Sequence, residues 1–212
     1  MTERDEERLA RLNLASYSGT AYRHQSPGFD PRSGTGARRR GGRFNPPRSF
    51  QVLYLALSVE TAAADLRQAA ERMNLPLAAV LPREVFVSTV SLDHVLDLRA
   101  SEALAGLEVT RNQLLAADQA RSRVVGEAVN RPGVQALIAP SATGVGDVLA
   151  LFPENLSAGT IEPRLLATWE AIGDVPDAST RVTPATGARP GAVDSRRRLY
   201  EWDRTTRAPG PE

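Results

Sequence analysis

The sequence predicts a single domain that mixes β-strands and α-helices. Short apolar runs bounded by polar residues, Gly or Pro recur along the chain, as is typical of buried strands. One longer segment repeats apolar residues at helical spacing behind a serine that can cap a helix. The length of 212 residues suffices for one domain with a hydrophobic core and hardly for two.

The N-terminal third of the chain contains one helix, one strand and one long loop in this prediction. Apolar residues at helical spacing in residues 1–15 assign an N-terminal helical region to residues 1–19. A short strand follows over residues 20–23. Residues 24–51 are rich in Gly, Pro, Ser and Arg and predict a long ordered loop, and such loops in compact domains are often functional.

The central part of the chain carries the remaining regular elements. A helix over residues 58–74 is predicted to be capped by Ser58, and a second one occupies about residues 110–130. Strands are predicted at residues 52–57, 85–90, 95–98, 134–139 and 148–152. The folded domain is thus assigned to residues 20–174, and the Pro- and Arg-rich residues 175–212 predict a disordered tail.

Composition narrows the classes of function and partner. The net charge is +1 and aromatic residues make up 5%, so we expect no direct nucleic-acid partner. All 26 basic residues are arginine, which a GC-rich genome also explains. An anion site in this chain must therefore use the forked donors of arginine or backbone N–H groups.

Other classes of site and location are disfavoured as well. No apolar run approaches the roughly 18 residues of a membrane span, and we expect no membrane association. The charged N-terminus does not resemble a signal peptide, and cysteine is absent, which favours a cytoplasmic protein. Two histidines without ligand spacing predict no metal site.

The long loop contains the first candidate site. Arg23 ends the predicted strand before it, and Arg43 follows Gly41-Gly42 within it. Glycines let a backbone approach a ligand closely, and arginines bind phosphate in a bidentate manner. The pattern is neither a Walker A loop nor a dinucleotide fingerprint. A solvated arginine-rich loop would give the same pattern.

Two further polar residues lie at the ends or margins of apolar elements. Asp65 is at the edge of the apolar face of the helix over residues 58–74, where a carboxylate can either face solvent or look into a cleft. Ser141 follows the strand at 134–139 without the Gly-x-Ser-x-Gly elbow of a hydrolase, so it is either a hydrogen-bonding group in a pocket or a turn-forming serine.

Together these segments resemble the RES domain family, named for its Arg, Glu and Ser residues, over about residues 20–156. Asn155, after the last predicted strand, also fits the family pattern. The segments that carry the resemblance are Tyr22-Arg23, Gly41-Gly42-Arg43-Phe44-Asn45-Pro46-Pro47, Val52-Leu53-Tyr54-Leu55-Ala56 with Glu60-Thr61-Ala62, and Ile138-Ala139-Pro140-Ser141-Ala142.

The resemblance implies a fold of the α+β class, with an ADP-ribosyltransferase-like split, mostly antiparallel β core and surrounding helices. It implies an NAD-consuming RES toxin of a bacterial toxin–antitoxin pair that cleaves the nicotinamide–ribose bond. The bond would be cleaved by hydrolysis, or by phosphorolysis with inorganic phosphate as co-substrate. The expected partner is a cognate Xre-type antitoxin, and homo-oligomer formation stays open. The alternatives are a protein ADP-ribosyltransferase, or a catalytically weakened RES-fold protein that binds NAD or a partner.

The resemblance also implies roles for individual residues. Asp65, Arg23 and Ser141 are the expected catalytic residues. Residues expected to bind NAD are Arg23, Arg43, Tyr54, Ser141 and Asn155. Asp65 stands where the family carries Glu and is one methylene shorter, and a misplacement of about 1 Å can reduce a rate roughly 100-fold. That difference is the reason for the weakened-protein alternative.

Overall fold

The structure, a computed structural model, describes residues 13–130 and 133–177. Within these ranges the strands are β1 (Ala15–Gln25), β2 (Leu53–Ala56), β3 (Arg83–Asp97), β4 (Ala136–Pro140), β5 (Asp147–Leu151) and β6 (Ile161–Trp169). The helices are α2 (Thr35–Arg40), α3 (Val59–Arg72), α4 (Ser101–Gly106), α5 (Arg111–Leu115) and α6 (Ala120–Val129), with short 3-10 turns η1 (Leu77–Val80), η2 (Pro153–Asn155) and η3 (Ile172–Asp174).

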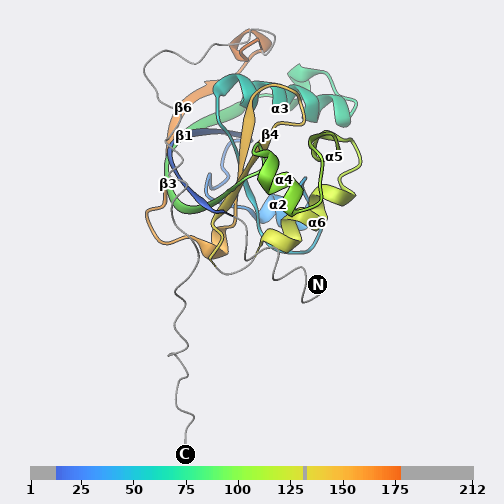
Figure 1. Cartoon of the computed structure of the whole chain (residues 1–212). Coiled ribbons are helices and arrows are strands. Elements are labelled where there is room, and N and C mark those ends of the chain that lie inside the picture. Colours follow the sequence, from blue (N-terminus) through green and yellow to red (C-terminus); the bar gives the residue numbers. More distant parts are fainter. Residues whose placement is uncertain (1–12, 131–132, 178–212) are drawn as a thin grey trace, which may run out of the picture.

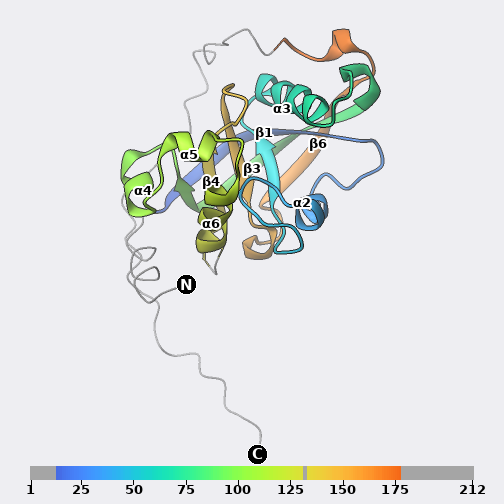
Figure 2. The same cartoon turned by 90° about the vertical axis from the view of Figure 1, so that its right-hand side faces the viewer.

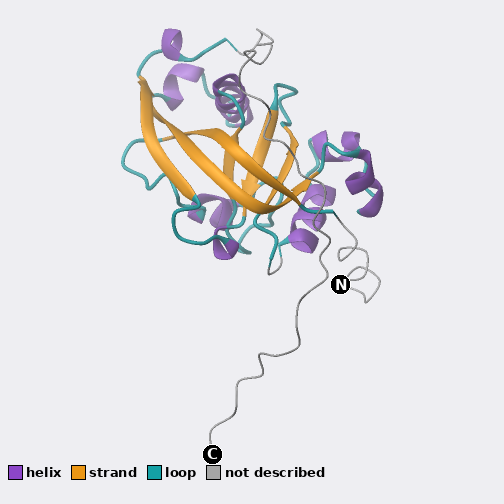
Figure 3. Ribbon diagram, turned by 60° about the vertical axis from the view of Figure 1, so that its left-hand side comes forward, coloured by secondary structure: helices purple, strands orange, loops and turns teal. Residues whose placement is uncertain are grey.

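The strands form one curved sheet in the order β1-β2-β5-β4-β3-β6, and β1 also pairs with β3. Only the β3–β4 pair is parallel among the strand pairs of the described residues. The helices lie around the strands, with α3 above them and α4, α5 and α6 gathered on one side (Figure 1, Figure 2, Figure 3). The predicted α+β class with a mostly antiparallel core is confirmed.

The sheet closes on itself at a weak seam. Strand β1 pairs with β3 along ten residue pairs, but its ladder pairing with β2 is limited to Tyr22 and Ala56. Few ladder hydrogen bonds therefore join β1 to β2, and a cleft can open beside that pair without breaking a long ladder.

Several predicted strands need correction. Strand β1 begins at Ala15, so the end of the predicted N-terminal helical region is wrong, and residues 1–12 of that region lie outside the described residues. The strands predicted at 85–90 and 95–98 are one continuous strand, β3. Strand β6 was not predicted at all.

The helices show one confirmation and two differences. Ser58 caps α3, because its Oγ accepts a hydrogen bond from the Thr61 N–H at 3.1 Å. The helix predicted over residues 110–130 is divided into α5 and α6, and the predicted loop contains α2. Of the predicted tail, Val175 is buried against the α3 side of the sheet, and residues 178–212 lie outside the described part. No helix in the described part is long and apolar enough to span a membrane.

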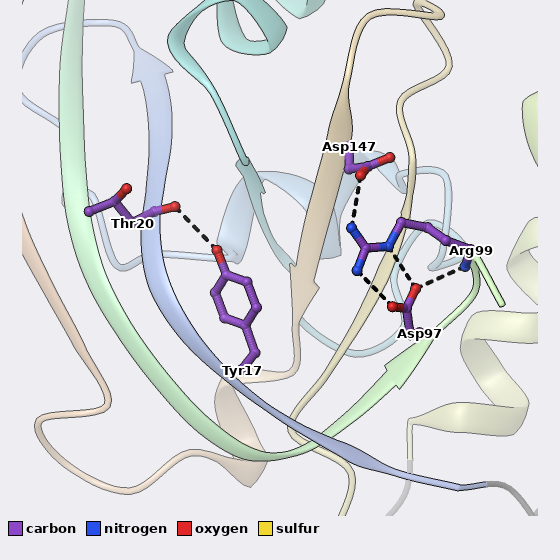
Figure 4. Close-up of polar contacts among 5 residues, drawn as sticks. All are labelled: Tyr17, Thr20, Asp97, Arg99 and Asp147. Atoms are coloured by element: carbon purple, nitrogen blue, oxygen red, sulfur yellow. Dashed lines mark hydrogen bonds and ion pairs between the residues drawn. The ribbon is translucent and has the colours of Figure 1, made fainter. Parts of the chain in front are cut away.

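An arginine joins the last residue of one strand to the first residue of another (Figure 4). Arg99 donates to both carboxylate oxygens of Asp97, the last residue of β3, and to Asp147, the first residue of β5, at 3.0 Å. Strand β4 lies between these two strands, so the guanidinium spans it. Burial alone would raise the pKa of Asp97, but hydrogen bonds from Arg99 outweigh it and hold that pKa below its usual range.

We expect Arg99→Gln to lower the free energy of unfolding by about 1–2 kcal/mol at pH 7, since the three side chains are still partly exposed. The pKa of Asp97 is lower in the folded state than in the unfolded state. The ion pair therefore stabilises the fold at a pH above the unfolded-state pKa, and this stabilisation is lost as the pH falls through the folded-state pKa. Urea unfolding at pH 7 and pH 3 measures this. The exposed Arg164→Gln serves as control, and an equal loss at both pH values would contradict the assignment.

Candidate functional site

A pocket of about 550 Å³ opens at the seam between β1 and β2. Its walls come from β1, β2, the end of α2 with the loop after it, one face of α3, the turn after β4, and residues of β5 and α6. Of the residues that the sequence analysis singled out, Arg23, Arg43, Tyr54, Asp65 and Ser141 all line this pocket. They come from five separate segments of the chain, and the fold brings them together.

The carboxylate of Asp65 meets the hydroxyl of Ser141 inside the pocket. Ser141 Oγ donates to Asp65 Oδ1 at 3.1 Å, and Ser141 is 1% exposed. Burial raises the pKa of Asp65 from 3.8 to about 6, against the opposing effects of the Ser141 hydrogen bond and of Arg72 and Arg43. At neutral pH this carboxylate is therefore largely ionised and still close enough to its pKa to accept a proton.

Three further hydrogen bonds in the turn after β4 fix the direction in which the Ser141 hydroxyl donates. The Thr143 hydroxyl lies 2.8 Å from Ser141 Oγ, and the Val145 N–H donates to Thr143 Oγ1 at 3.2 Å. The Thr143 N–H also donates to Ser141 Oγ at 3.2 Å. When Ser141 donates to Asp65, Thr143 must donate to Ser141, so the chain of donors points at the carboxylate. Thr143 was not recognised in the sequence, because it supports Ser141 through the turn after β4 rather than through a motif.

The Tyr54 hydroxyl is engaged in hydrogen bonds with the loop after α2. Its hydroxyl accepts from the Phe44 N–H at 2.8 Å and donates to Asn45 Oδ1 at 3.0 Å. The Asn45 amide in turn donates to the Ala37 carbonyl at 2.9 Å. A Cβ at Gly42 would lie 2.6 Å from the Tyr54 hydroxyl oxygen, so only glycine fits there. Tyr54 thus holds the Gly-Gly-Arg-Phe-Asn segment against β2 and offers the pocket its ring rather than its hydroxyl.

Arg23 and Arg43 are each tied by one nitrogen to backbone carbonyls. Arg23 Nη1 donates to the carbonyls of Pro31 and Ser33, and Arg43 Nη1 donates to those of Leu114 and Ala116 at 2.6 and 3.0 Å. Burial lowers the pKa of both guanidinium groups, which nevertheless stay charged. The tethers orient each arginine and leave its remaining donors for a ligand.

The pocket is strongly positive. Arg40, Arg72 and Arg123 also line it, whereas Asp65 is the single carboxylate among its lining residues. No ion pair joins any of the five lining arginines to a carboxylate within the described ranges. A pocket with five guanidinium groups and one carboxylate suits a ligand with several negative charges. The sequence analysis did not identify Arg72 or Arg123 as site residues.

Two residues fall outside the predicted arrangement. Asn155 does not line the pocket: its amide donates to the Val134 carbonyl at 2.6 Å, so the expectation that it binds NAD finds no support in the geometry. His24 lines the pocket although no role was predicted for it, and its ring packs on Trp169. Burial, followed by the charges of Arg83 and Arg23, lowers the pKa of His24 to about 3, so the imidazole is neutral.

Comparison with known proteins bears on the family and the fold of this chain. The family model of the RES domain matches residues 20–172. The NAD(+) phosphorylase MbcT of Mycobacterium tuberculosis and that of Mycobacterium bovis are each 28% identical over 160 residues, covering 74% of this chain and 86% of the relative. The crystal structure of the M. tuberculosis MbcT-MbcA toxin–antitoxin complex is similar with a TM-score of 0.72 and 26% identity, covering 80% of this chain and 93% of the other.

Proposed function

This chain belongs to the RES domain family, and from that premise we propose that it is an NAD-cleaving toxin of a bacterial toxin–antitoxin pair. The observation that carries the proposal is the contact of Asp65 with Ser141 inside an arginine-lined pocket. The relatives named NAD(+) phosphorylase support inorganic phosphate as the co-substrate. The MbcT-MbcA complex supports a protein antitoxin as partner, for which we propose the Xre type. We also propose the cytoplasm as the place of action.

The reaction breaks the bond between nicotinamide and C1′ of the ribose, and nicotinamide leaves with the bonding electrons. A cation-like ribosyl centre forms. Hydrogen bonds to the ribose 2-hydroxyl strengthen at this stage and, together with distortion of the substrate, stabilise the transition state by several kcal/mol. We assign this contact to Asp65. Ser141 orients the carboxylate and binds the ribose or the carboxamide, while Arg23 and Arg43 bind the pyrophosphate with donors that their tethers leave over.

Tyr54 borders the nicotinamide in this proposal. Its hydroxyl is engaged by Phe44 and Asn45, so we assign it a stacking contact through the ring. The two nucleophiles make different demands. A phosphate dianion attacks through an oxygen that carries no proton, whereas water must lose one, and Asp65 with its pKa of about 6 can accept it.

The test is to incubate the purified chain with NAD, with and without inorganic phosphate, and to follow nicotinamide and the ribosyl product by chromatography. We expect phosphate-dependent release with ADP-ribose 1″-phosphate as product, and at least about a tenfold loss in Arg23→Ala. ADP-ribose formed without dependence on phosphate would indicate hydrolysis. Radiolabel from NAD transferred to proteins of an extract would indicate an ADP-ribosyltransferase.

Asp65 favours a second candidate, a protein that binds NAD or its partner with weakened turnover. An aspartate holds its carboxylate one methylene closer to α3 than the glutamate of the family would. NAD binding by calorimetry without nicotinamide release, together with release by Asp65→Glu, would establish this candidate and refute the first. The contact of Asp65 with Ser141 argues for turnover, because the shorter side chain still reaches its partner.

A further inference from the structure

One face of α3 carries more than the proposed catalytic carboxylate. Asp65, Gln68, Ala69 and Arg72 are spaced at i, i+3, i+4 and i+7, so they lie along a single side of the helix, and all four line the pocket. Arg72 is exposed at the C-terminal end of this row. It lies at the rim of the pocket, where a small solute enters from solvent.

The guanidinium of Arg72 is held in place rather than free. Arg72 Nη1 donates to Gln68 Oε1 at 2.5 Å, and Gln68 Nε2 donates to the Ala142 carbonyl at 3.4 Å. Gln68 thereby links Arg72 to the turn that carries Ser141. In contrast to Arg23 and Arg43, which bind two backbone carbonyls each, Arg72 makes this one hydrogen bond within the described residues. Its other donors are left for a ligand.

Arg43, Arg72 and Asp65 all line the pocket and lie close enough for their charges to act on one another. The charges of Arg72 and Arg43 both act on Asp65, and the charge of Arg72 acts on Arg43. No nitrogen of either arginine lies within 4.0 Å of the carboxylate, since neither forms an ion pair with it in the described part. The two guanidinium groups repel each other, and neither is paired with the carboxylate. An oxyanion bound between them would neutralise their positive charge.

We propose that Arg72, oriented by Gln68 and assisted by Arg43, binds the inorganic phosphate that attacks the ribose. This assignment rests on the proposed function and names the site of its second substrate. In the step, a phosphate oxygen forms a bond to C1′ while the C1′–nitrogen bond breaks, and nicotinamide takes the bonding electrons. Hydrogen phosphate keeps its proton, so no further acid, base or co-reactant is needed.

The competing source of the same oxyanion chemistry is the pyrophosphate of NAD itself, and steady-state kinetics separate the two. We expect Arg72→Gln to raise the KM for phosphate at least about tenfold, the loss typical of a charged hydrogen bond. The KM for NAD at saturating phosphate should change less than about twofold. Arg39→Gln is the matched control, because this substitution removes the same charge from an exposed position on α2. Arg39 does not line the pocket.

Three outcomes would overturn the assignment. Equal increases in both KM values would place Arg72 on the pyrophosphate, and no change in either would remove it from the site. An equal increase of the KM for phosphate in Arg39→Gln would show that the effect comes from the overall charge of the protein and not from a contact of Arg72 with phosphate. Calorimetric titration of inorganic phosphate into the free protein tests the site without turnover. Weaker binding to Arg72→Gln than to the native chain would support the site even if nicotinamide release, and with it the proposed function, failed.

Discussion

Asp65→Asn is expected to lower kcat/KM for NAD at least about 100-fold, because about 3 of the several kcal/mol supplied around the ribose hydroxyl would be lost. In the native chain we expect kcat/KM to rise with pH through about 6, the pKa of Asp65, as the carboxylate ionises. The pH–rate profile of phosphate-dependent nicotinamide release measures both effects. A pH limb that persisted in Asp65→Asn would assign the titration to another group.

The same substitution is expected to stabilise the free protein at high pH. Folding raises the pKa of this carboxyl from 3.8 to about 6. Its contribution to stability is fully present at a pH below the unfolded-state pKa and is lost as the pH rises through about 6. The ionised, half-buried carboxylate therefore destabilises the native chain by roughly 3 kcal/mol at pH 8, because each unit of difference between its folded and unfolded pKa corresponds to about 1.36 kcal/mol. Denaturant unfolding of both proteins at pH 4 and pH 8 checks this. Stabilisation of equal size at both pH values would show that the charge is not its cause.

Such a trade-off of stability for a charged group is common at functional sites. Ser141 reduces it, since its hydrogen bond lowers the pKa of Asp65 and opposes burial. The donor chain through Thr143 keeps the Ser141 hydroxyl turned towards the carboxylate. Family resemblance pointed to Asp65 and Ser141 separately, and the structure adds the contact between them and the support behind it.

Local signals in the sequence were enough for some elements and not for others. Ser58 and the apolar face behind it specify α3 locally, so that helix was predicted within two residues at each end. Strand β6 is an edge strand whose side chains are mostly exposed and which contains Pro163, so it lacks the alternating pattern of a half-buried strand. Its position is set by pairing with β3, a contact that the local sequence does not encode.

The break between α5 and α6 has a tertiary cause as well. No Gly or Pro separates them, so the pattern over residues 110–130 reads as one helix. Arg43 binds the carbonyls of Leu114 and Ala116 where α5 ends, and those carbonyls then need no helical partner. A side chain that is about 70 positions away in the sequence therefore helps to end the helix, and the same two hydrogen bonds fix the position of Arg43 in the pocket.

The second large effect is expected at Gly126, in the middle of α6. A Cβ built at this position would lie 1.7 Å from the carbonyl oxygen of Phe44, so the helix packs directly on the backbone of the pocket loop. Gly126→Ala would force the two segments apart by about 1.3 Å before the contact reached even 3.0 Å. Overpacking of this kind lowers the free energy of unfolding by about 1–3 kcal/mol, and we expect the upper end of that range because the opposing atom is backbone.

Gly126→Ala should also reduce activity in the protein that stays folded, because Phe44 follows Arg43 directly and its N–H donates to the Tyr54 hydroxyl. A displacement of about 1 Å in this loop moves the arginine relative to Asp65 and is expected to reduce kcat/KM for NAD roughly 100-fold. Thermal unfolding and nicotinamide release measure the two effects in one preparation. Gly173→Ala is the matched control, since a Cβ there meets nothing within 4 Å, and it should change neither quantity measurably. Near-native activity in a folded Gly126→Ala protein would mean that the loop does not depend on α6 for its position, and the pocket geometry argued above would then be wrong.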